Sequence, residues 1–299
     1  MKHYNSVLSL SLAVTLLMFA VVSCGGNASV KPTGSTQISS GGNGSSTGSG
    51  GSGTPPPPST PPPPTPPPPP PPPPPGGSGA TANVLDNVED TSKWLTCGNC
   101  GNDGATGATP NFSFTPGVVS PSEDGVSTQF TISPTVPYTN AYFYLSHTPV
   151  TSQIGALSYE FDVYIPSGSQ NAPQAFEFEC QQILNGWIYN FGWQANYTLN
   201  VWRIFDYGAK RWDTANIPFS AFTAGAWHHI VAEYHNDVTT HVVTHDALTV
   251  DGVRYPVNIQ HNAFFSGAGN QFTNAVQLDS NSSAVAYSVY VDKMKITWQ

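Results

Sequence analysis

Alternation of apolar and polar side chains with a period of two is the feature that most constrains the fold of this chain. In residues 159–165 every second side chain is a large apolar one, and Glu160 and Asp162 fall between them. Residues 176–181 repeat the pattern, with two glutamates and a glutamine on the polar side. Successive side chains of a strand point to opposite faces of its sheet. The pattern therefore predicts strands that bury one face and leave the other polar.

The same period recurs along the C-terminal two thirds of the chain. The alternating segments are separated by clusters of Gly, Pro, Asn and Asp, which are typical of turns between strands. We find no convincing helical stripe after the first 24 residues. The sequence predicts an all-β fold, a two-sheet antiparallel sandwich. Its further strands are expected over residues 126–133, 138–147, 187–197, 201–207, 226–235, 241–250 and 284–298.

Two segments resemble a known family pattern. Residues 225–231 read Gly-Ala-Trp-His-His-Ile-Val, and residues 248–252 read Leu-Thr-Val-Asp-Gly. They resemble the laminin-G and pentraxin-like pattern, which implies the concanavalin A-like jelly roll shared by lectins and glucanases. Residues 191–212 resemble an uncharacterised group of secreted bacterial domains with that fold. In this pattern Trp227 is expected in the core, and the fold by itself does not imply an activity.

The ends of the domain resemble those of carbohydrate-binding jelly rolls. Residues 85–90 and 290–296 are similar to the first and last strands of many such modules, which usually pair. Related modules often hold a structural calcium ion nearby, and calcium prefers six or more oxygen ligands. The resemblance makes Asp86, Glu89 and Asp292 candidate ligands. No other cofactor is expected.

The first 24 residues carry an export signal. An apolar run over residues 7–22 follows Lys2 and leads into Ser-Cys, with Cys24 as the last residue. This resembles the bacterial lipoprotein signal, which implies cleavage before Cys24 and lipidation of its thiol and new amino terminus. The run is shorter than the roughly 20 apolar residues of a membrane-spanning helix. An ordinary cleaved signal is the alternative.

Composition divides the chain into four parts. Residues 1–23 form the signal peptide, and residues 24–54 form a linker rich in Gly and Ser that cannot bury enough apolar surface to fold. Residues 55–79 form a polyproline spacer with a glycine hinge. At about 3.1 Å per residue, its proline blocks would extend roughly 65 Å. Residues 80–299 form the folded domain, which the tether would hold away from its membrane.

The charge of the domain excludes one class of partner. All eighteen acidic residues lie in residues 80–299, with seven of the nine Lys and Arg, so the net charge there is −11. Proteins that bind the nucleic-acid backbone need clustered Lys and Arg. The sequence therefore argues against a nucleic-acid partner.

Three cysteines remain after Cys24. In an oxidising envelope, Cys97 and Cys100 are expected to form a small loop disulfide. Cys180 alternates with two phenylalanines, so it is expected to be a buried, unpaired residue.

Aromatic and amide residues are concentrated in residues 187–212. Sugar rings stack on aromatic side chains, and amides bond their hydroxyl groups. Because most aromatic residues of a sandwich fill its core, only one or two of these are expected at the surface. The candidate ligand-binding residues are Trp187, Trp193, Gln194, Asn196, Trp202 and Arg203.

Four carboxylates form a candidate catalytic set, namely Glu160, Asp162, Glu177 and Glu179. If their two strands are neighbours, the four share one surface, and repulsion would raise some of their pKa values, as a general acid requires. Retaining glycosidases place two carboxyl groups about 5 Å apart. The Glu-x-Asp-x-x-Glu motif of glucanases with this fold is absent. Solvated side chains or hydrogen-bonding partners of a ligand are therefore the preferred interpretation.

These observations predict an envelope lipoprotein that displays a lectin-like domain and binds a polysaccharide or glycan without cleaving it. One alternative is a glycoside hydrolase or polysaccharide lyase that uses the carboxylate face. Another is an adhesive or structural module with a protein partner. We expect export across the inner membrane and a lipid anchor at Cys24, in the outer membrane because Gly25 offers no Asp-type retention signal.

Overall fold

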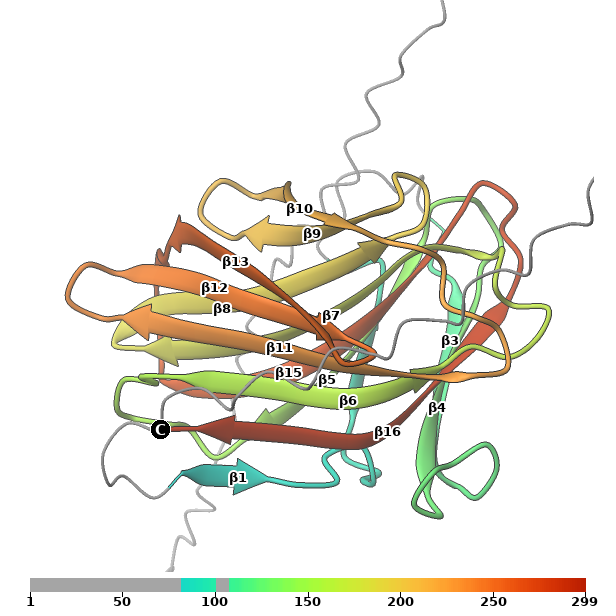
Figure 1. The fold of residues 1–299 in the computed structure, drawn as a ribbon, viewed down its shortest axis with the longest axis horizontal. Helices are drawn as coiled ribbons and strands as arrows, with labels where there is room; N and C mark the ends of the chain where they lie inside the picture. Colours follow the sequence, from blue (N-terminus) through green and yellow to red (C-terminus); the bar gives the residue numbers. More distant parts are fainter. Residues whose placement is uncertain (1–81, 101–107) are drawn as a thin grey trace, which may run out of the picture. The chain divides into compact units, whose positions relative to one another are not determined.

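The fold is described by a computed structural model for residues 82–100 and 108–299. The predictions for the signal peptide, Cys24, the linker and the polyproline spacer lie outside the described residues. Every element that the described ranges contain is a strand, and the strands form two antiparallel sheets (Figure 1). These ranges hold no apolar helix of the length needed to cross a bilayer.

The first sheet contains the two ends of the domain. Figure 1 shows β12, β11, β6 and β16 side by side in it. The first described strand pairs with the last, as expected, with Leu85 opposite Ile296. In spatial order the strands are β13 (Val253–Asn262), β12 (Val242–Val250), β11 (Trp227–Asp237), β6 (Leu157–Tyr164), β16 (Tyr287–Trp298), β4 (Ser127–Ser133) and β3 (Asn111–Val118), with β1 (Asn83–Leu85) also on β16.

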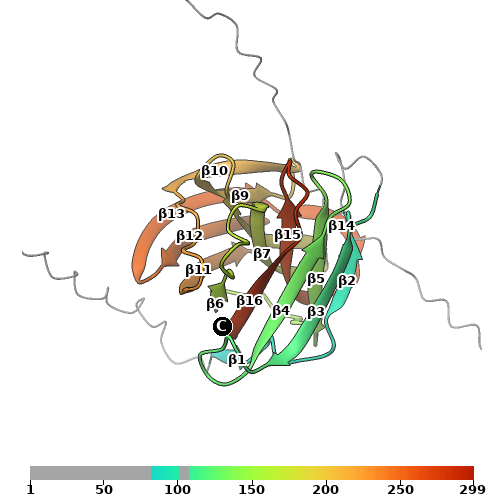
Figure 2. The ribbon, with the colours of Figure 1, turned by 90° about the vertical axis from the view of Figure 1, so that its right-hand side faces the viewer.

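The second sheet packs on the first and holds most of the aromatic and amide-rich segment. Together the two sheets confirm the predicted fold class, an antiparallel two-sheet sandwich (Figure 2). In spatial order the strands are β10 (Arg211–Pro218), β9 (Val201–Asp206), β8 (Gly186–Asn196), β7 (Pro173–Leu184), β15 (Gln271–Ser280), β5 (Asn140–His147) and β2 (Leu95–Gly98), with β14 (Phe264–Ala268) on β8.

Two-residue turns fix the register of two hairpins. Asn185 and Gly186 join β7 to β8 with φ of 50° and 84°, and Leu184 pairs with Trp187 across the turn. Asp251 and Gly252 join β12 to β13 in the same way, with φ of 50° and 79°. Positive φ at both positions is the geometry of the hairpin turn that Asn-Gly and Asp-Gly favour. These turns determine which side chains share a face of each sheet.

The core lies between the sheets and is rich in aromatic residues. Phe176 and Phe178 of β7 face Tyr159 and Phe161 of β6, and the rings of Phe161 and Phe178 are 4.9 Å apart, edge to face. Cys180 is buried among them with a free thiol. Burying each large apolar side chain contributes about 1.5–3 kcal/mol. The polar residues between them therefore point to the outward faces of the sandwich.

Candidate functional site

The outward face of the second sheet carries a continuous set of amides and carboxylates from three adjacent strands. These side chains alternate with core residues on β8, β7 and β15, and strand register places them side by side. We call this set the amide–carboxylate face. It consists of Glu177, Glu179, Gln181, Asn190, Gln194, Asn196, Gln277 and Asp279.

Each glutamate of this face accepts two hydrogen bonds. Tyr142 of β5 donates its hydroxyl to Glu179 at 2.5 Å, and Asn190 donates its amide to the other oxygen at 2.7 Å. Gln194 and Gln277 donate to the two oxygens of Glu177 at 2.6 and 2.8 Å. Both carboxyl groups are therefore held in place by side chains that approach β7 from both sides.

Burial controls the charge of this face. Burial, followed by the charge of Asp279, raises the pKa of Glu177 well above its ordinary value. Burial also raises the pKa of Asp279, to about 6, and the two carboxyl groups share a hydrogen bond. Gln277 donates one amide group to both of them, at 2.8 and 2.9 Å. Burial and mutual repulsion therefore both oppose ionisation of the two carboxyl groups together.

Two basic residues complete the charge balance. The ammonium of Lys210 lies 3.3 Å from the ring centre of Tyr207, a cation–π contact, and burial lowers its pKa to about 8. Arg203 donates to the carbonyl of Trp212 at 2.7 Å and to Gln194 at 3.3 Å. These two cations lie beside the three carboxyl groups of Glu177, Glu179 and Asp279. The face therefore carries no excess of positive charge.

Aromatic clusters flank the polar face on both sides. On the β9–β10 side, Phe205 and Trp212 pack together with their ring centres 5.0 Å apart, and Tyr207 belongs to the same cluster. On the β5 side, Tyr142 stacks on Tyr144 at 5.5 Å. Polar groups between aromatic side chains are the usual composition of a site for a ligand with hydroxyl groups and apolar faces.

Four buried polar atoms on this side of the sheet have no hydrogen-bond partner among the described residues. They are Oδ1 of Asn140, Oδ1 of Asn190, Oε1 of Gln277 and Nε1 of Trp212. The first three accept hydrogen bonds and the last donates one. Nearly all buried polar groups of proteins are paired, so each of these four atoms needs a water or ligand partner.

The structure corrects the prediction for the tryptophans. Trp193 and Trp202 do not face a ligand, because both are buried between the sheets and their rings contact each other edge to face at 6.4 Å. Trp187 is half-buried and stacks on His241 at 3.8 Å. The remaining candidates, Gln194, Asn196 and Arg203, take part in the outward hydrogen-bond network.

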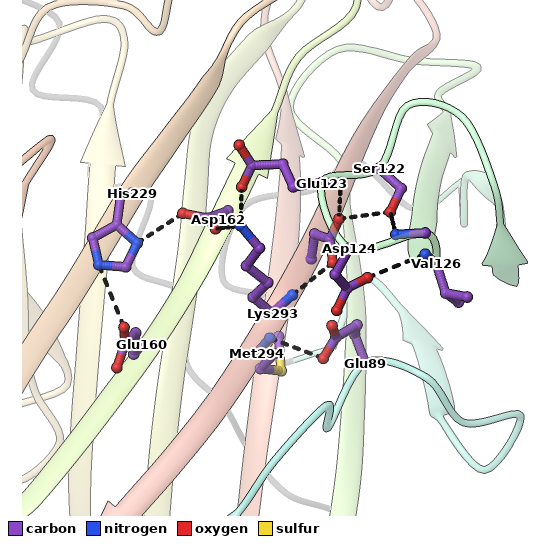
Figure 3. A network of polar contacts seen from close by, with 12 residues as sticks. Glu89, Ser122, Glu123, Asp124, Val126, Glu160, Asp162, His229, Lys293 and Met294 are labelled. Carbon is purple, nitrogen blue, oxygen red and sulfur yellow. Dashed lines mark hydrogen bonds and ion pairs between the residues drawn. The ribbon is translucent and has the colours of Figure 1, made fainter.

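The predicted surface of four carboxylates is also wrong. Strand β6 belongs to the first sheet and β7 to the second, so Glu160 and Asp162 point away from the sandwich on the opposite side from Glu177 and Glu179. Figure 3 shows Glu160 and Asp162 with His229 between them, at 3.5 and 2.7 Å. The hydrogen bond with Asp162 raises the pKa of His229. Asp162 also faces Lys293 at 3.6 Å, so each of the two carboxylates has a basic partner.

The candidate calcium ligands implied by the family resemblance are not brought together as one group of carboxylates. Asp86 is exposed, and the three carboxylates are not among the side-chain groups close enough to share a metal ion. Asp292 accepts hydrogen bonds from Ser122 and from the Glu123 and Lys293 amides. Glu89 is buried and accepts one from the Met294 amide (Figure 3). These contacts pair the carboxylate of Asp292 and one oxygen of Glu89, whereas Oε1 of Glu89 has no partner among the described residues.

Trp227 is not a core residue. It is half-buried on the outward face of β11 and packs against Tyr164, whose ring centre is 5.3 Å away. The reason is strand parity: Ile230, Ala232 and Tyr234 occupy the inward positions of β11, and Trp227 falls on the other set.

Several residues of the face were not predicted from the sequence. Tyr142 was expected on a strand without a functional role, and Gln277 and Asp279 lie on β15, a strand that was not predicted. A signal was present, because residues 271–280 alternate Phe272, Val276 and Leu278 with polar residues. The disulfide between Cys97 and Cys100 lies beside this face, where Cys100 packs near Tyr142.

The comparisons with known proteins show a similarity in fold only. No family model matches the chain, and no curated protein matches it. Similar solved structures include a carbohydrate-binding module of the β-sandwich superfamily, at 12% identity and a TM-score of 0.37 over 71% of this chain and 60% of that one. This chain thus spans less than two thirds of that protein's length.

Two further structures are matched over nearly their whole length. One is a carbohydrate esterase from the Shiga toxin-encoding bacteriophage phi24B, at 13% identity and a TM-score of 0.42, covering 73% of this chain and 100% of that one. The other is basic winged bean lectin with Tn-antigen, at 8% identity and a TM-score of 0.42, covering 73% and 99%. Similarity this low carries no argument about activity.

Proposed function

We propose that the domain binds a neutral glycan on the amide–carboxylate face of the second sheet. The observation that carries this proposal is the group of unpaired, buried polar atoms on Asn140, Asn190, Gln277 and Trp212. Glycan hydroxyl groups both donate and accept hydrogen bonds, so they are suited to three acceptors and one donor. The flanking aromatic clusters supply apolar surface for sugar rings.

Charge favours a neutral ligand over an anionic one. The two cations, Lys210 and Arg203, lie beside the three carboxyl groups of Glu177, Glu179 and Asp279, so this face has no excess of positive charge. An acidic polysaccharide would need an excess of cations on this face. The proposal therefore excludes acidic glycans as the preferred ligands.

Hydrogen bonding favours binding over hydrolysis. A hydrolytic acid or nucleophile needs a carboxyl oxygen directed at the substrate. Both oxygens of Glu177 and both oxygens of Glu179 already accept hydrogen bonds from protein side chains. A hydrolase acting through these two residues is the second candidate, because burial and Asp279 raise the pKa of Glu177 as a general acid requires.

A glycan array with the full chain tests the proposal, and Trp212→Phe tests the site. This variant keeps an aromatic ring but removes the unpaired N–H, so affinity for a bound neutral glycan is expected to fall about tenfold. Trp227→Phe, on the outward face of the other sheet, is the matched control and should bind as the parent does.

Three results would contradict the proposal. Absence of binding to any neutral glycan would argue against glycan recognition and leave a protein-binding module. An equal loss of glycan affinity in Trp212→Phe and Trp227→Phe would show that the amide–carboxylate face is not the binding site. Release of reducing sugar that disappears in Glu177→Gln or Glu179→Gln would favour the hydrolase.

We also propose that Cys24 carries the lipid anchor of the protein in an outer membrane. The support is the signal-like sequence that ends at Cys24. In a bacterial host fed labelled palmitate, the parent is expected to be labelled and to sediment with membranes, and Cys24→Ser is expected to lose both properties. Cys100→Ser is the control and should keep the label. An unlabelled parent would contradict the anchor.

A further inference from the structure

A second group of polar side chains lies where the open edges of the two sheets approach each other. Strand β10 ends the second sheet and β13 ends the first, and they are not hydrogen-bonded to each other. Asp206 at the end of β9, Asp213 on β10 and His261 on β13 come together there, with one ligand atom from each within 4.8 Å of the others.

The site is a defined pocket. A cavity of about 460 Å³ is lined by these three residues and by Arg211, Gln260 and Asn262, among others. The turn that joins β9 to β10 approaches β13 closely at Gly208, where an added Cβ would lie 3.2 Å from the Asn262 carbonyl oxygen. The two sheets are thus near enough for one ion to contact both.

The burial of His261 and the position of its ring support a metal site independently of the two carboxylates. Only 8% of its side chain is exposed, its Nδ1 has no partner among the described residues, and its Nε2 lies 3.3 Å from Asp213 Oδ2. This distance is long for a hydrogen bond to a carboxylate. Two ligand atoms around one tetrahedral zinc ion, each about 2.0 Å from it, lie about 3.3 Å apart. The separation therefore fits a pair of metal ligands better than a direct hydrogen bond.

A positive charge already occupies the mouth of this pocket. Arg211 donates to both oxygens of Asp213 at 2.9 and 3.2 Å and lies 3.8 Å from Asp206. Its side chain is 62% exposed, and exposed ion pairs contribute at most about 1 kcal/mol. A divalent cation can therefore displace the guanidinium into solvent at little cost.

We propose that Asp206, Asp213 and His261 bind a divalent transition-metal cation, of which Zn²⁺ is the best match, and that this ion cross-links the two sheets. Zinc binds both imidazole nitrogens and carboxylate oxygens, and three protein ligands leave a fourth position open to water. Calcium and magnesium prefer ligand sets made of oxygen alone. The two carboxylates neutralise the ion.

Titration of the full chain with ZnCl₂, without reductant so that the disulfide stays closed, tests the proposal. Calorimetry is expected to show one site per chain, and zinc at about a hundred times its Kd should raise Tm by about 5–10 °C. Asp213→Asn and His261→Gln should weaken binding at least about tenfold. Arg211→Gln should tighten it, because the competing cation is gone.

The chain offers a matched control for the aspartate change. His235 and Asp246 form a second histidine–aspartate pair at 2.8 Å, which belongs to no three-ligand group among the described residues. Asp246→Asn should bind zinc as the parent does. Cobalt in place of zinc should give the intense visible bands of a tetrahedral site in the parent, and these should be absent in Asp213→Asn.

The proposal is overturned if zinc leaves Tm unchanged, or if Asp213→Asn and Asp246→Asn bind it equally. Circular dichroism of each variant checks the fold. If the largely buried His261 cannot be replaced without unfolding, Asp206→Asn provides the second variant. The outcome is independent of glycan binding, because none of the three ligands belongs to the amide–carboxylate face.

Discussion

Replacing Trp193 with alanine is expected to lower the free energy of unfolding by about 3–5 kcal/mol, as for other buried Trp-to-Ala changes. Trp193 is fully buried between the sheets. Its ring contacts Trp202 at 6.4 Å and His245 at 5.7 Å, so the truncated side chain would leave a cavity lined by groups from both sheets. Urea denaturation followed by fluorescence and circular dichroism measures the loss.

The stability lost in Trp227→Ala provides the control, because this tryptophan lies on an outward face and Trp193 lies in the core. Trp227 is half-buried on the outward face of the first sheet, so its replacement should cost clearly less than that of Trp193. Similar losses in the two variants would contradict the placement of Trp193. A Trp193→Ala protein that is as stable as the parent but no longer binds glycan would return this residue to the ligand site.

The alternation of side chains predicted which residues share a face, and the apolar or polar character of each set indicates which face is buried. On β8 one set contains Tyr189, Phe191 and Trp193, and the other contains Asn190, Gly192 and Gln194. The amide-rich set is the outward one, and this contrast was present in the sequence. Trp193 belongs to the aromatic set, so the same contrast places it in the core and the amides between the rings on the outward face.

The choice of sheet for each strand is not encoded in local pattern. Strands β6 and β7 follow each other in the chain and show the same alternation, yet they belong to different sheets. A hairpin turn such as Asn185–Gly186 identifies neighbouring strands, and residues 165–172 between β6 and β7 contain no such two-residue turn. Adjacency of Glu160 and Glu177 was therefore an assumption, and the structure contradicts it.

The contacts that define both sites join distant parts of the chain. Tyr142 is 37 residues from Glu179, and Gln277 is 100 residues from Glu177. Asp213 and His261 come from different sheets. Such pairs depend on strand order and register, which periodicity alone does not determine. This is why the residue types of the sites were visible in the sequence but their partners were not.

Replacing Glu89 with glutamine is expected to stabilise the protein at neutral pH. Burial, opposed by hydrogen bonds and reinforced by the charges of Asp90 and Asp292, raises the pKa of Glu89 from its ordinary value of 4.5 to about 8. Its Oε2 accepts a hydrogen bond from the Met294 amide at 2.9 Å, and its Oε1 has no partner among the described residues. Glutamine keeps the acceptor and cannot ionise.

The pH dependence follows from proton binding. Between these two pKa values the folded protein keeps a proton that the unfolded chain releases, so the stability contributed by Glu89 is complete below the unfolded pKa and is lost as pH rises towards the folded one. The loss is about 1.4 kcal/mol per pH unit, or roughly 3 kcal/mol at neutral pH. The free energy of unfolding of Glu89→Gln should therefore exceed that of the parent by an amount that grows steadily between about pH 5 and about pH 8.

Urea denaturation of both proteins across this range measures the difference, and Glu160→Gln serves as the control on a half-exposed glutamate that lies beside His229. The control should show no comparable gain. A difference between Glu89→Gln and the parent that stays flat with pH would mean that Glu89 is ionised in the folded state. Because a buried, ionised carboxylate needs a compensating positive charge, that result would indicate a cation beside Glu89 and Asp292.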